Sequence, residues 1–327
     1  MIDKSAIVRK IEVFRNKKVL IVGDVMVDEY MWGKVNRISP EAPIPIVSVK
    51  EKDSRLCGAA NVALNVSALG AEAIMCSVIG KDEKGSVFKD LLHERKLSSE
   101  GIIESTLRKT TVKTRIISSG QHLLRVDEED SHPIDSKHSE ELYNRIKSLV
   151  NKYTIDVIIF EDYDKGVLSQ HLIEKLTKLD KEKNIFTTVD PKKNNFLDYR
   201  NISLFKPNLK EFSEGVKTDI DKHELDKLKS HAQTFINNQD IEILMITLSE
   251  KGVFIADNKN MHHFPAEIRD ISDVSGAGDT VISVASLLLA SGAELTEIAQ
   301  VSNIAGGLVC EKTGVVPINP DELIAEL

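Results

Sequence analysis

Two glycines and a carboxylate stand together before an apolar helical pattern, in the segment DVSGAGDT over residues 273–280. Gly276 and Gly278 leave room for backbone amides to face a ligand, and Ala277 lies between them. The amino-terminal end of the following helix would add a positive dipole at the same point. Asp279 lies in its first turn, so its carboxylate could take a proton from a hydroxyl while the amides hold a transferring phosphoryl group. Taken alone, the segment also fits an ordinary capped helix after a glycine turn.

Short apolar runs that alternate with helical patterns must position this segment. The runs cover residues 18–24, 73–80, 155–162, 185–191, 202–208 and 241–248. Their alternation with helices predicts an α/β fold with a parallel sheet and helical crossovers. Several runs end in a polar residue, namely Asp24, Asp162, Asp190, Asn208 and Thr247. Ligands of open α/β sheets gather at the carboxyl ends of strands, so we expect these side chains around one crevice. Each of them alone also fits a turn that ends a strand.

Two segments rich in β-forming residues interrupt this alternation, at about residues 28–50 and 110–127. The second is typical of a hairpin that turns at Ser119 and Gly120. Together they predict a small β-sheet lid, which would exclude water from a phosphoryl-transfer reaction. They also fit an edge hairpin or a dimerisation surface. Because we find no repeat and no long linker, we expect one domain over residues 1–327.

The composition limits the classes of partner. The net charge of −8 and the pI of about 5.7 argue against a nucleic-acid-binding surface. The charged N-terminus does not resemble a signal peptide, and no apolar run is long enough for a membrane span, so we expect no membrane association. Cys57, Cys76 and Cys310 are an odd number without paired spacing, which predicts a reducing, cytoplasmic compartment.

Several motifs, in order, resemble those of one family. CGAANVALN at 57–65, NLKE at 208–211, TLSEKG at 247–252 and the DVSGAGDT segment are similar to the substrate, magnesium and nucleotide motifs of the ribokinase-like (PfkB) carbohydrate kinases. The resemblance extends from about Lys18 to the C-terminus. It implies a doubly wound, mostly parallel sheet sandwiched by helices, with a small β-sheet lid. It also implies ATP-dependent, Mg²⁺-requiring phosphoryl transfer to a sugar, and K⁺ activation is common among such kinases.

Within this family, the stretches VGDVMVDEYMWG, NRISPEAPIPIV, EDYDKG and KPNLKE look most like the kinases of the bacterial heptose pathway. That branch phosphorylates D-glycero-β-D-manno-heptose 7-phosphate at its anomeric oxygen, giving the 1,7-bisphosphate used for ADP- or GDP-heptose and lipopolysaccharide or surface-glycan precursors. Many of its members are fused to an adenylyltransferase, and the sequence ending at Leu327 suggests a stand-alone form. The resemblance also implies a homodimer through the lid strands. The alternatives are a PfkB-type kinase for another sugar or sugar phosphate, and a catalytically silent sugar-binding protein of the same fold.

The resemblance assigns roles to individual residues. Asp279 would be the catalytic base, and the anion hole would comprise Gly276, Ala277 and Gly278. The implied sugar contacts are Asp24, Gly58, Asn61 and Asp162. The candidates for the substrate phosphate are Lys165, Lys192, Arg37, Arg115 and Arg125. The implied nucleotide-side residues are Asn208, Glu211, Thr247, Gly252 and Asn303.

Glu211 would act on magnesium as an outer-shell ligand, through water. Asn208 and Glu211 also fit a helix capping box that lacks only the usual Ser or Thr. Three positions depart from the heptose-kinase pattern. Cys57 replaces a glycine, which puts the sugar in question because its side chain could narrow the pocket. Ser275 replaces a threonine but keeps the hydroxyl, and Leu248 replaces a polar residue on the nucleotide side.

Overall fold

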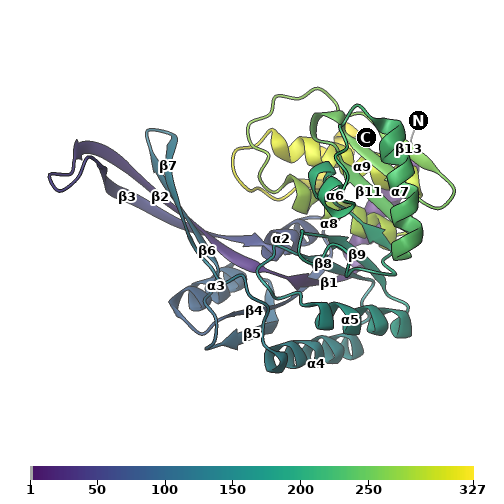
Figure 1. Ribbon diagram of the computed structural model, residues 1–327, viewed down its shortest axis with the longest axis horizontal. Helices are drawn as coiled ribbons and strands as arrows, with labels where there is room; N and C mark the ends of the chain where they lie inside the picture. The colour runs from purple at the N-terminus through teal and green to yellow at the C-terminus, as the bar shows by residue number, and fades with distance from the viewer. Residues whose placement is uncertain (1–2) are drawn as a thin grey trace.

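The computed structural model describes residues 3–327, which form two β-sheets and the helices around the larger one (Figure 1). The larger sheet has nine strands, in the order β13 (Met261–Phe264), β12 (Val253–Ala256), β11 (Ile243–Thr247), β10 (Leu204–Phe205), β9 (Phe186–Asp190), β8 (Val157–Glu161), β1 (Lys18–Gly23), β4 (Glu72–Gly80) and β5 (Ser98–Ser105). Pairing is parallel from β11 to β5, whereas β12 and β13 are antiparallel at one edge.

Helices cover both faces of this sheet. Those packed with the first hydrophobic cluster are α1 (Lys4–Val13), α2 (Ala59–Ala68), α3 (Glu83–Glu94), α8 (Ala277–Ala290), α9 (Leu295–Cys310) and α10 (Pro320–Glu326). Those packed with the second are α4 (Ser136–Lys152), α5 (Gln170–Lys183), α6 (Leu209–Gly215) and α7 (Leu225–Gln239). Short 3₁₀ turns are η1 (Phe14–Asn16) and η2 (Ser249–Lys251).

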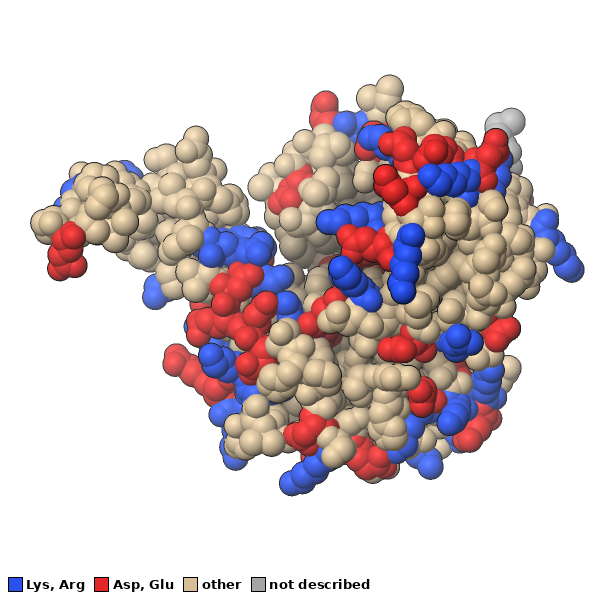
Figure 2. Space-filling view, in the orientation of Figure 1, with Lys and Arg blue, Asp and Glu red and all other residues tan. Residues whose placement is uncertain are grey.

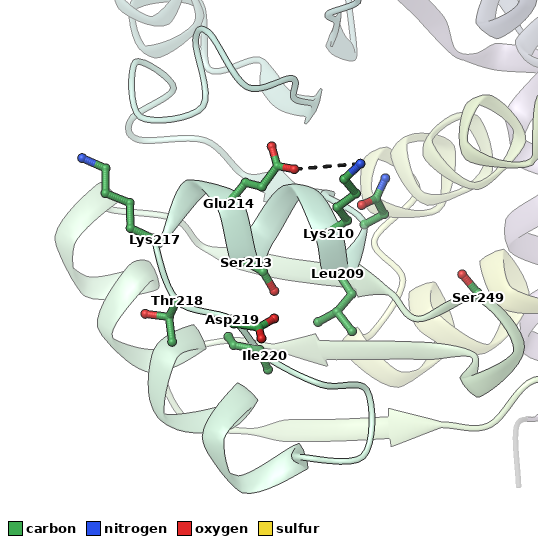
Figure 3. A pocket seen from close by; sticks show the side chains of 10 residues that line it. Leu209, Lys210, Ser213, Glu214, Lys217, Thr218, Asp219, Ile220 and Ser249 are labelled. Atoms are coloured by element: carbon green, nitrogen blue, oxygen red, sulfur yellow. Dashed lines mark ion pairs between the residues drawn. The ribbon is translucent and has the colours of Figure 1, made fainter.

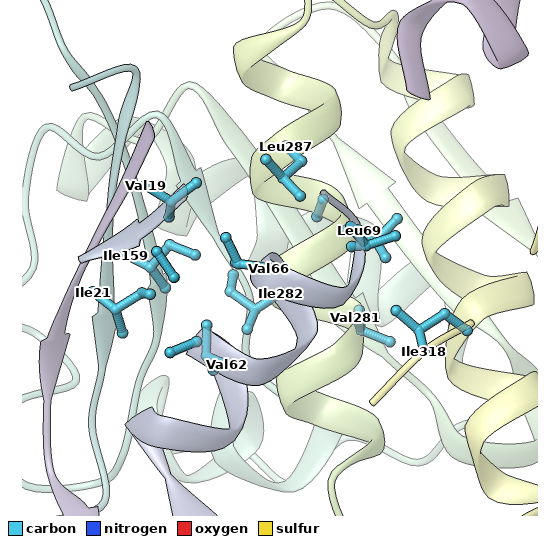
Figure 4. Close-up of a cluster of buried hydrophobic side chains, with 14 of the residues drawn as sticks. Val19, Ile21, Val62, Val66, Leu69, Ile159, Val281, Ile282, Leu287 and Ile318 are labelled. Carbon is cyan, nitrogen blue, oxygen red and sulfur yellow. The ribbon is translucent and has the colours of Figure 1, made fainter. Parts of the chain in front are cut away.

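The alternation of side chains along β1 explains this three-layer arrangement. Val19 and Ile21 belong to the first cluster, whereas Leu20 and Val22 belong to the second. Successive strand residues point to opposite faces, so a continuous apolar run buries both faces of the sheet. Figure 4 shows the first cluster, in which Val19 and Ile21 of the sheet lie near α2 and α8. The predicted α/β sandwich is therefore confirmed.

The smaller sheet, which we call the flap, contains β2 (Val25–Ile38), β3 (Pro45–Gly58), β6 (Val112–Ser118) and β7 (Gln121–Glu128). In Figure 1 it projects from the body as a long arm. The predicted lid segments lie within it, but its first hairpin is longer than expected, because β2 starts next to β1 and β3 leads directly into α2. The root of the flap is thus built into the body, while all eight residues of β7 are exposed.

The described residues also bear on membrane-spanning helices and cysteine pairing. No helix within residues 3–327 combines the length and apolarity that a bilayer crossing requires. The three cysteines are free thiols, and Cys76 and Cys310 are buried.

Candidate functional site

The first turn of α8 has the geometry of an anion-binding helix end. Gly276 is its N-cap with φ +81°, a conformation that L side chains rarely adopt. A Cβ atom there would lie 2.9 Å from the Asn61 side-chain nitrogen and 3.2 Å from Val315. At Gly278 a Cβ would lie 3.5 Å from an Asp190 oxygen and 3.7 Å from Lys206 Nζ. The predicted glycine turn therefore exists, and its helix end is approached by side chains from four other parts of the chain.

Asp279 is buried in this turn and accepts two hydrogen bonds. Asn61 Nδ2 donates to Oδ2 over 2.6 Å, and the Tyr163 hydroxyl donates to Oδ1 over 2.8 Å. Burial raises the pKa of Asp279 to about 6, although these two hydrogen bonds stabilise the ionised form and lower it. A carboxylate with this pKa is ionised near neutrality and basic enough to take a proton from a hydroxyl.

The position of Asn61 depends on how α2 docks against α8. Asn65, one turn further along α2, accepts hydrogen bonds from the Thr280 hydroxyl and the Ile318 amide, both over 3.0 Å. At the start of α2, Gly58 has φ +65°, and a Cβ there would lie 2.5 Å from the Asp24 carbonyl oxygen. The predicted residues Gly58 and Asn61 are thus brought to the base, Asn61 by direct contact.

Three buried carboxyl groups lie close together at this point. One oxygen from each of Glu161, Asp190 and Asp279 lies within 4.8 Å of the others. Strand register accounts for two of them, because Glu161 ends β8 directly opposite Asp190 of β9. Lys206 Nζ lies 2.8 Å from Asp190 and is itself buried. Burial, and then the negative charges of Asp190 and Asp279, raise the pKa of Glu161 well above its ordinary value.

Asp24 lies at the predicted strand end, but its carboxylate holds a loop. The amides of Tyr163 and Lys165 donate to Oδ2 over 2.9 and 3.0 Å, and the amide of Val167 donates to Oδ1 over 3.0 Å. These contacts fix the EDYDKG loop that follows β8. Asp24 therefore holds this loop in place, in addition to the sugar contact that the resemblance implies.

Asp162 holds the same loop from its other side. Its oxygens accept from the Asp164 amide over 2.9 Å, from Asn195 Nδ2 over 2.8 Å and from the Tyr199 hydroxyl over 2.7 Å. Asp162 is buried, with 1% of its surface exposed. Both acids expected to contact sugar are thus occupied by protein donors.

Asn208 and Glu211 form the capping box that the sequence allowed as an alternative. Asn208 Oδ1 accepts from the Glu211 amide over 2.9 Å, and Glu211 Oε2 accepts from the Asn208 amide over 2.8 Å. The other Glu211 oxygen contacts Lys192 Nζ. With both oxygens already engaged, Glu211 fits a divalent ion through water, as an outer-shell ligand, better than by direct coordination. The capping box does not compete with that role.

Of the other residues expected on the nucleotide side, the structure places one at this helix start. Thr247 at the end of β11 forms a β-bridge with Asn208. Gly252 has φ +87°, and a Cβ there would lie 2.0 Å from the Phe264 carbonyl oxygen, so glycine is required. Asn303 on α9 donates to the Pro265 carbonyl oxygen over 2.9 Å and so anchors the loop before α8. Leu248 is buried in the second cluster, which explains an apolar residue at that position.

The five basic candidates differ in position. Lys192 Nζ lies 5.6 Å from the centre of the ring of Tyr163, the residue whose hydroxyl contacts Asp279. Lys165 Nζ pairs with Glu129 over 2.8 Å. Arg115 pairs with Asp28 at the flap root. Arg125 pairs with Asp127 on β7, and Arg37 is exposed near the far end of β2.

Cys57 lies beside the crevice, as its place in the motif suggested. Burial, and then the negative charge of Asp279, raise the pKa of its thiol to about 11, so the thiol is neutral. Its backbone φ is not positive, whereas that of Gly58 is. The substitution of glycine by cysteine is therefore tolerated by the backbone.

A wide surface hollow of about 810 Å³ lies beside α6 rather than over the base. Figure 3 shows its lining, with Leu209, Ser213 and Ile220 facing the space and Lys210 paired with Glu214 at its rim. It borders Asn208 and Ser249 but does not include Asp279. Figure 2 shows acidic and basic side chains intermixed on this face of the body rather than gathered into one basic surface.

Sequence reasoning missed three residues of the site. Tyr163 and Glu161 lie within the EDYDKG stretch, and Lys206 lies within KPNLKE, two stretches that carry the family resemblance. The sequence does not show in which direction each of their side chains points. A strand ending in Phe-Glu-Asp presents Glu161 and Asp162 to opposite faces, and only the first faces the base.

A family model described as "pfkB family carbohydrate kinase" matches residues 16–322. The chain belongs to the pfkB family of carbohydrate kinases. It is 37% identical over 322 residues to the bifunctional protein HldE of Syntrophotalea carbinolica, covering 98% of this chain and 65% of that protein. It is 38% identical over 315 residues to HldE of Geotalea uraniireducens, covering 96% and 63% respectively. The chain thus spans less than two thirds of the length of these curated relatives.

Solved structures of pfkB-type kinases share the fold. Phosphofructokinase-2 from Escherichia coli in complex with potassium superposes with a TM-score of 0.78 at 18% identity, covering 95% of this chain and 98% of that one. Arabidopsis thaliana ribokinase complexed with ribose and ATP gives a TM-score of 0.71 at 14% identity, covering 94% and 98%. The family match makes the chain a carbohydrate kinase, and kinases of this class use ATP together with a divalent metal.

Proposed function

We propose that this kinase phosphorylates the anomeric oxygen of D-glycero-β-D-manno-heptose 7-phosphate, giving the 1,7-bisphosphate for ADP- or GDP-heptose and surface-glycan precursors. The observation that carries the proposal is the Asp279 carboxylate, held by Tyr163 of the heptose-type EDYDKG stretch. That contact connects the base to the loop whose sequence most resembles the heptose branch. The similarity to HldE proteins over nearly the whole chain supports the same assignment.

The chain's own residues supply base, anion site and positioning. Asp279 takes the proton from the acceptor hydroxyl as that oxygen attacks the terminal phosphoryl group. The amides of the first turn of α8, with Gly276 and Gly278 lacking side chains, face the oxygens of that group. Lys206, next to Gly278, adds a positive charge on the same side. Asn61 and Tyr163 keep the carboxylate oriented.

We infer that Mg²⁺ accompanies ATP on the Asn208 and Glu211 side, held by Glu211 through water. When bound, the ion neutralises charge on the transferring phosphates. Potassium is proposed as an activator by analogy with the phosphofructokinase-2 complex, whose fold this chain shares. Among the basic candidates, Lys192 and Arg115 are the best supported for the substrate phosphate, because Lys192 lies near the Tyr163 ring and Arg115 at the flap root.

We also propose a cytoplasmic homodimer joined through the flap. The supporting observation is the set of large apolar residues left exposed there, namely Val35, Ile38, Ile44, Val49, Leu123, Leu124 and Val126. Figure 2 shows that most of the outer flap carries no charged side chains on this face. Exposed apolar edge strands are readily paired with a second copy. The three free thiols suit a reducing compartment.

The test is ADP release from Mg-ATP with a panel of purified acceptors. The panel holds both anomers of heptose 7-phosphate, together with fructose, fructose 1-phosphate and tagatose 6-phosphate. We expect strong selectivity for the β-anomer of heptose 7-phosphate. Selective turnover of another acceptor would overturn the heptose assignment and leave a kinase for a different sugar, with Cys57 as the first residue to examine. The Asp279→Asn protein controls for contaminating kinases.

A further inference from the structure

One buried carboxyl group in the crevice has an oxygen that no group in the described residues hydrogen-bonds. Glu161 is 1% exposed, and its Oε2 atom has no hydrogen-bond partner within residues 3–327. A buried carboxyl group without a partner carries a large desolvation cost. Such groups are normally satisfied, so an unsatisfied one at a ligand crevice points to a ligand that supplies the missing partner.

The neighbouring carboxyl groups each accept hydrogen bonds from protein groups or pair with a lysine. Asp279 accepts from Asn61 and Tyr163, and Asp190 pairs with Lys206. Asp24 and Asp162, the acids expected from resemblance to contact sugar hydroxyls, each accept three hydrogen bonds from the loop and its supports. Glu161 is therefore the carboxyl group of this cluster that has a buried oxygen without a hydrogen-bond partner in the described residues.

The surroundings favour a hydroxyl over a cation as the partner. Lys206 already brings a positive charge to Asp190, and both oxygens of Asp279 accept hydrogen bonds from protein donors. Burial and the nearby negative charges also raise the pKa of Glu161, and a protonated carboxyl can both donate to and accept from a hydroxyl. A cation site would need these carboxylates free and ionised.

We propose that Glu161 binds the sugar hydroxyl adjacent to the one that is phosphorylated, so that Asp279 and Glu161 together recognise a vicinal diol. The inference rests on the proposed kinase function and adds a specificity-determining residue to it. Its geometric basis is the separation of at most 4.8 Å between the carboxyl oxygens of the two residues. Neighbouring ring hydroxyls lie about one hydrogen-bond length apart, so each can reach its own carboxyl group across that gap.

The backbone fixes this pair rigidly. Glu161 pairs with Gly23 of β1 and with Asp190 of β9 in the middle of the sheet. A Cβ at Gly23 would lie 1.9 Å from the Glu161 carbonyl oxygen, so the two strands approach as closely as glycine permits. A carboxyl group on such a strand end keeps its position, which is what discrimination between sugars requires.

The experiment compares the acceptor with its analogue in which the hydroxyl next to the attacked one is replaced by hydrogen. For heptose 7-phosphate this is the 2-deoxy compound. We expect wild-type kcat/KM to fall by about 100-fold or more on the analogue, because a site built to bond a hydroxyl rejects a ligand that lacks it. Glu161→Ala should reduce that ratio to within about threefold, mainly by losing activity on the natural acceptor.

Glu161→Gln provides a variant of nearly unchanged shape, and Glu104→Gln on the exposed edge strand β5 is the matched control. Melting temperatures establish folding, and we expect Glu161→Gln to be at least as stable as wild type, since a buried carboxyl without a partner is removed. Glu104→Gln should keep the wild-type ratio. An unchanged ratio in folded Glu161→Ala would overturn the proposal.

Calorimetric titration with acceptor alone gives a readout independent of turnover. Glu161→Ala should weaken binding of the natural acceptor and leave binding of the deoxy analogue unchanged. If the wild type instead prefers another sugar, the same comparison on that sugar tests Glu161 separately from the heptose assignment. Tight binding of Mn²⁺ alone, detected by electron paramagnetic resonance and lost in Glu161→Gln, would identify a cation site and overturn the hydroxyl assignment.

Discussion

The floor of the crevice and the flap differ in how far the chain satisfies its own groups. The floor, made by the ends of β1, β8 and β9 and the first turn of α8, holds nearly every buried polar group with a protein partner. The flap leaves the whole of β7 and several large apolar side chains exposed. The floor is thus organised before any ligand arrives, whereas the flap has surface that only another molecule can bury.

This difference separates two kinds of functional residue. Residues of the floor act through fixed geometry, so their substitution should change chemistry or stability directly. Residues of the outer flap act through association, so their substitution should change the oligomer first. Each prediction below tests one side of that separation.

The largest effect is expected at the base. Asp279→Asn should lower kcat by about 10²- to 10⁴-fold, because general base catalysis typically contributes that much. Acceptor binding, measured by calorimetry, should stay within a few fold of wild type.

The Asp279→Asn variant should also be more stable than wild type at neutral pH. The raised pKa of Asp279 means that its ionisation destabilises the fold as pH rises from about 4 through 6. Wild-type turnover in this variant would show that another group is the base.

The next effect is expected at the loop clamp. Asp24→Asn replaces one acceptor oxygen by a donor that faces a backbone amide, which should cost about 2–3 kcal/mol in the free energy of unfolding. Denaturant titration measures the change. Asp90→Asn on the exposed side of α3 is the control and should change stability by less than about 0.5 kcal/mol. Equal stability of the two variants would show that Asp24 does not hold the EDYDKG loop.

The flap should respond differently. The double substitution of Leu124 and Val126 by lysine should raise the dissociation constant of the proposed dimer by about 100-fold, because charges replace apolar contacts at its centre. Light scattering and sedimentation follow the association. Leu107→Lys, at a position that is also exposed but lies outside the flap, should leave the dissociation constant unchanged. A wild-type protein that is monomeric at working concentrations would contradict the proposed dimer.

The smallest effect is expected in the pH profile. The base acts in its ionised form and its pKa is about 6, so kcat/KM should fall about tenfold per pH unit below that value and level off above it. Tyr163→Phe removes a hydrogen bond that stabilises the ionised form, so the acid limb should move to higher pH. An unmoved limb in that variant would show that the hydroxyl does not influence the base.

Much of the floor could be predicted from the sequence, because it is made by local patterns. The runs at β1, β4, β8 and β11 are mostly apolar, β9 is rich in β-branched residues, and DVSGAGDT predicts the glycine turn before α8. The edge strand β5 was missed because SSEGIIES has too few apolar residues. Strands β12 and β13 were missed because each has only four residues.

The partners of the acidic residues could not be predicted. Asp24 and Asp162 end strands as expected, but the amides that fill Asp24 come from a loop about 140 positions later in the chain. Which carboxyl group remains free is decided by that loop, not by the strand-end pattern. The capping box at Asn208 shows the converse, since local spacing alone specified it.

The hydrogen bond between Asn61 and Asp279 joins positions 218 residues apart. The two helices that carry them lie side by side in the fold but are among the first and the last of the body to leave the ribosome. A nascent chain can therefore complete most of its sheet while its base has neither orientation nor burial. A chain that has not yet reached α8 therefore lacks the proposed base, and its helix α2 lacks the partner that orients Asn61.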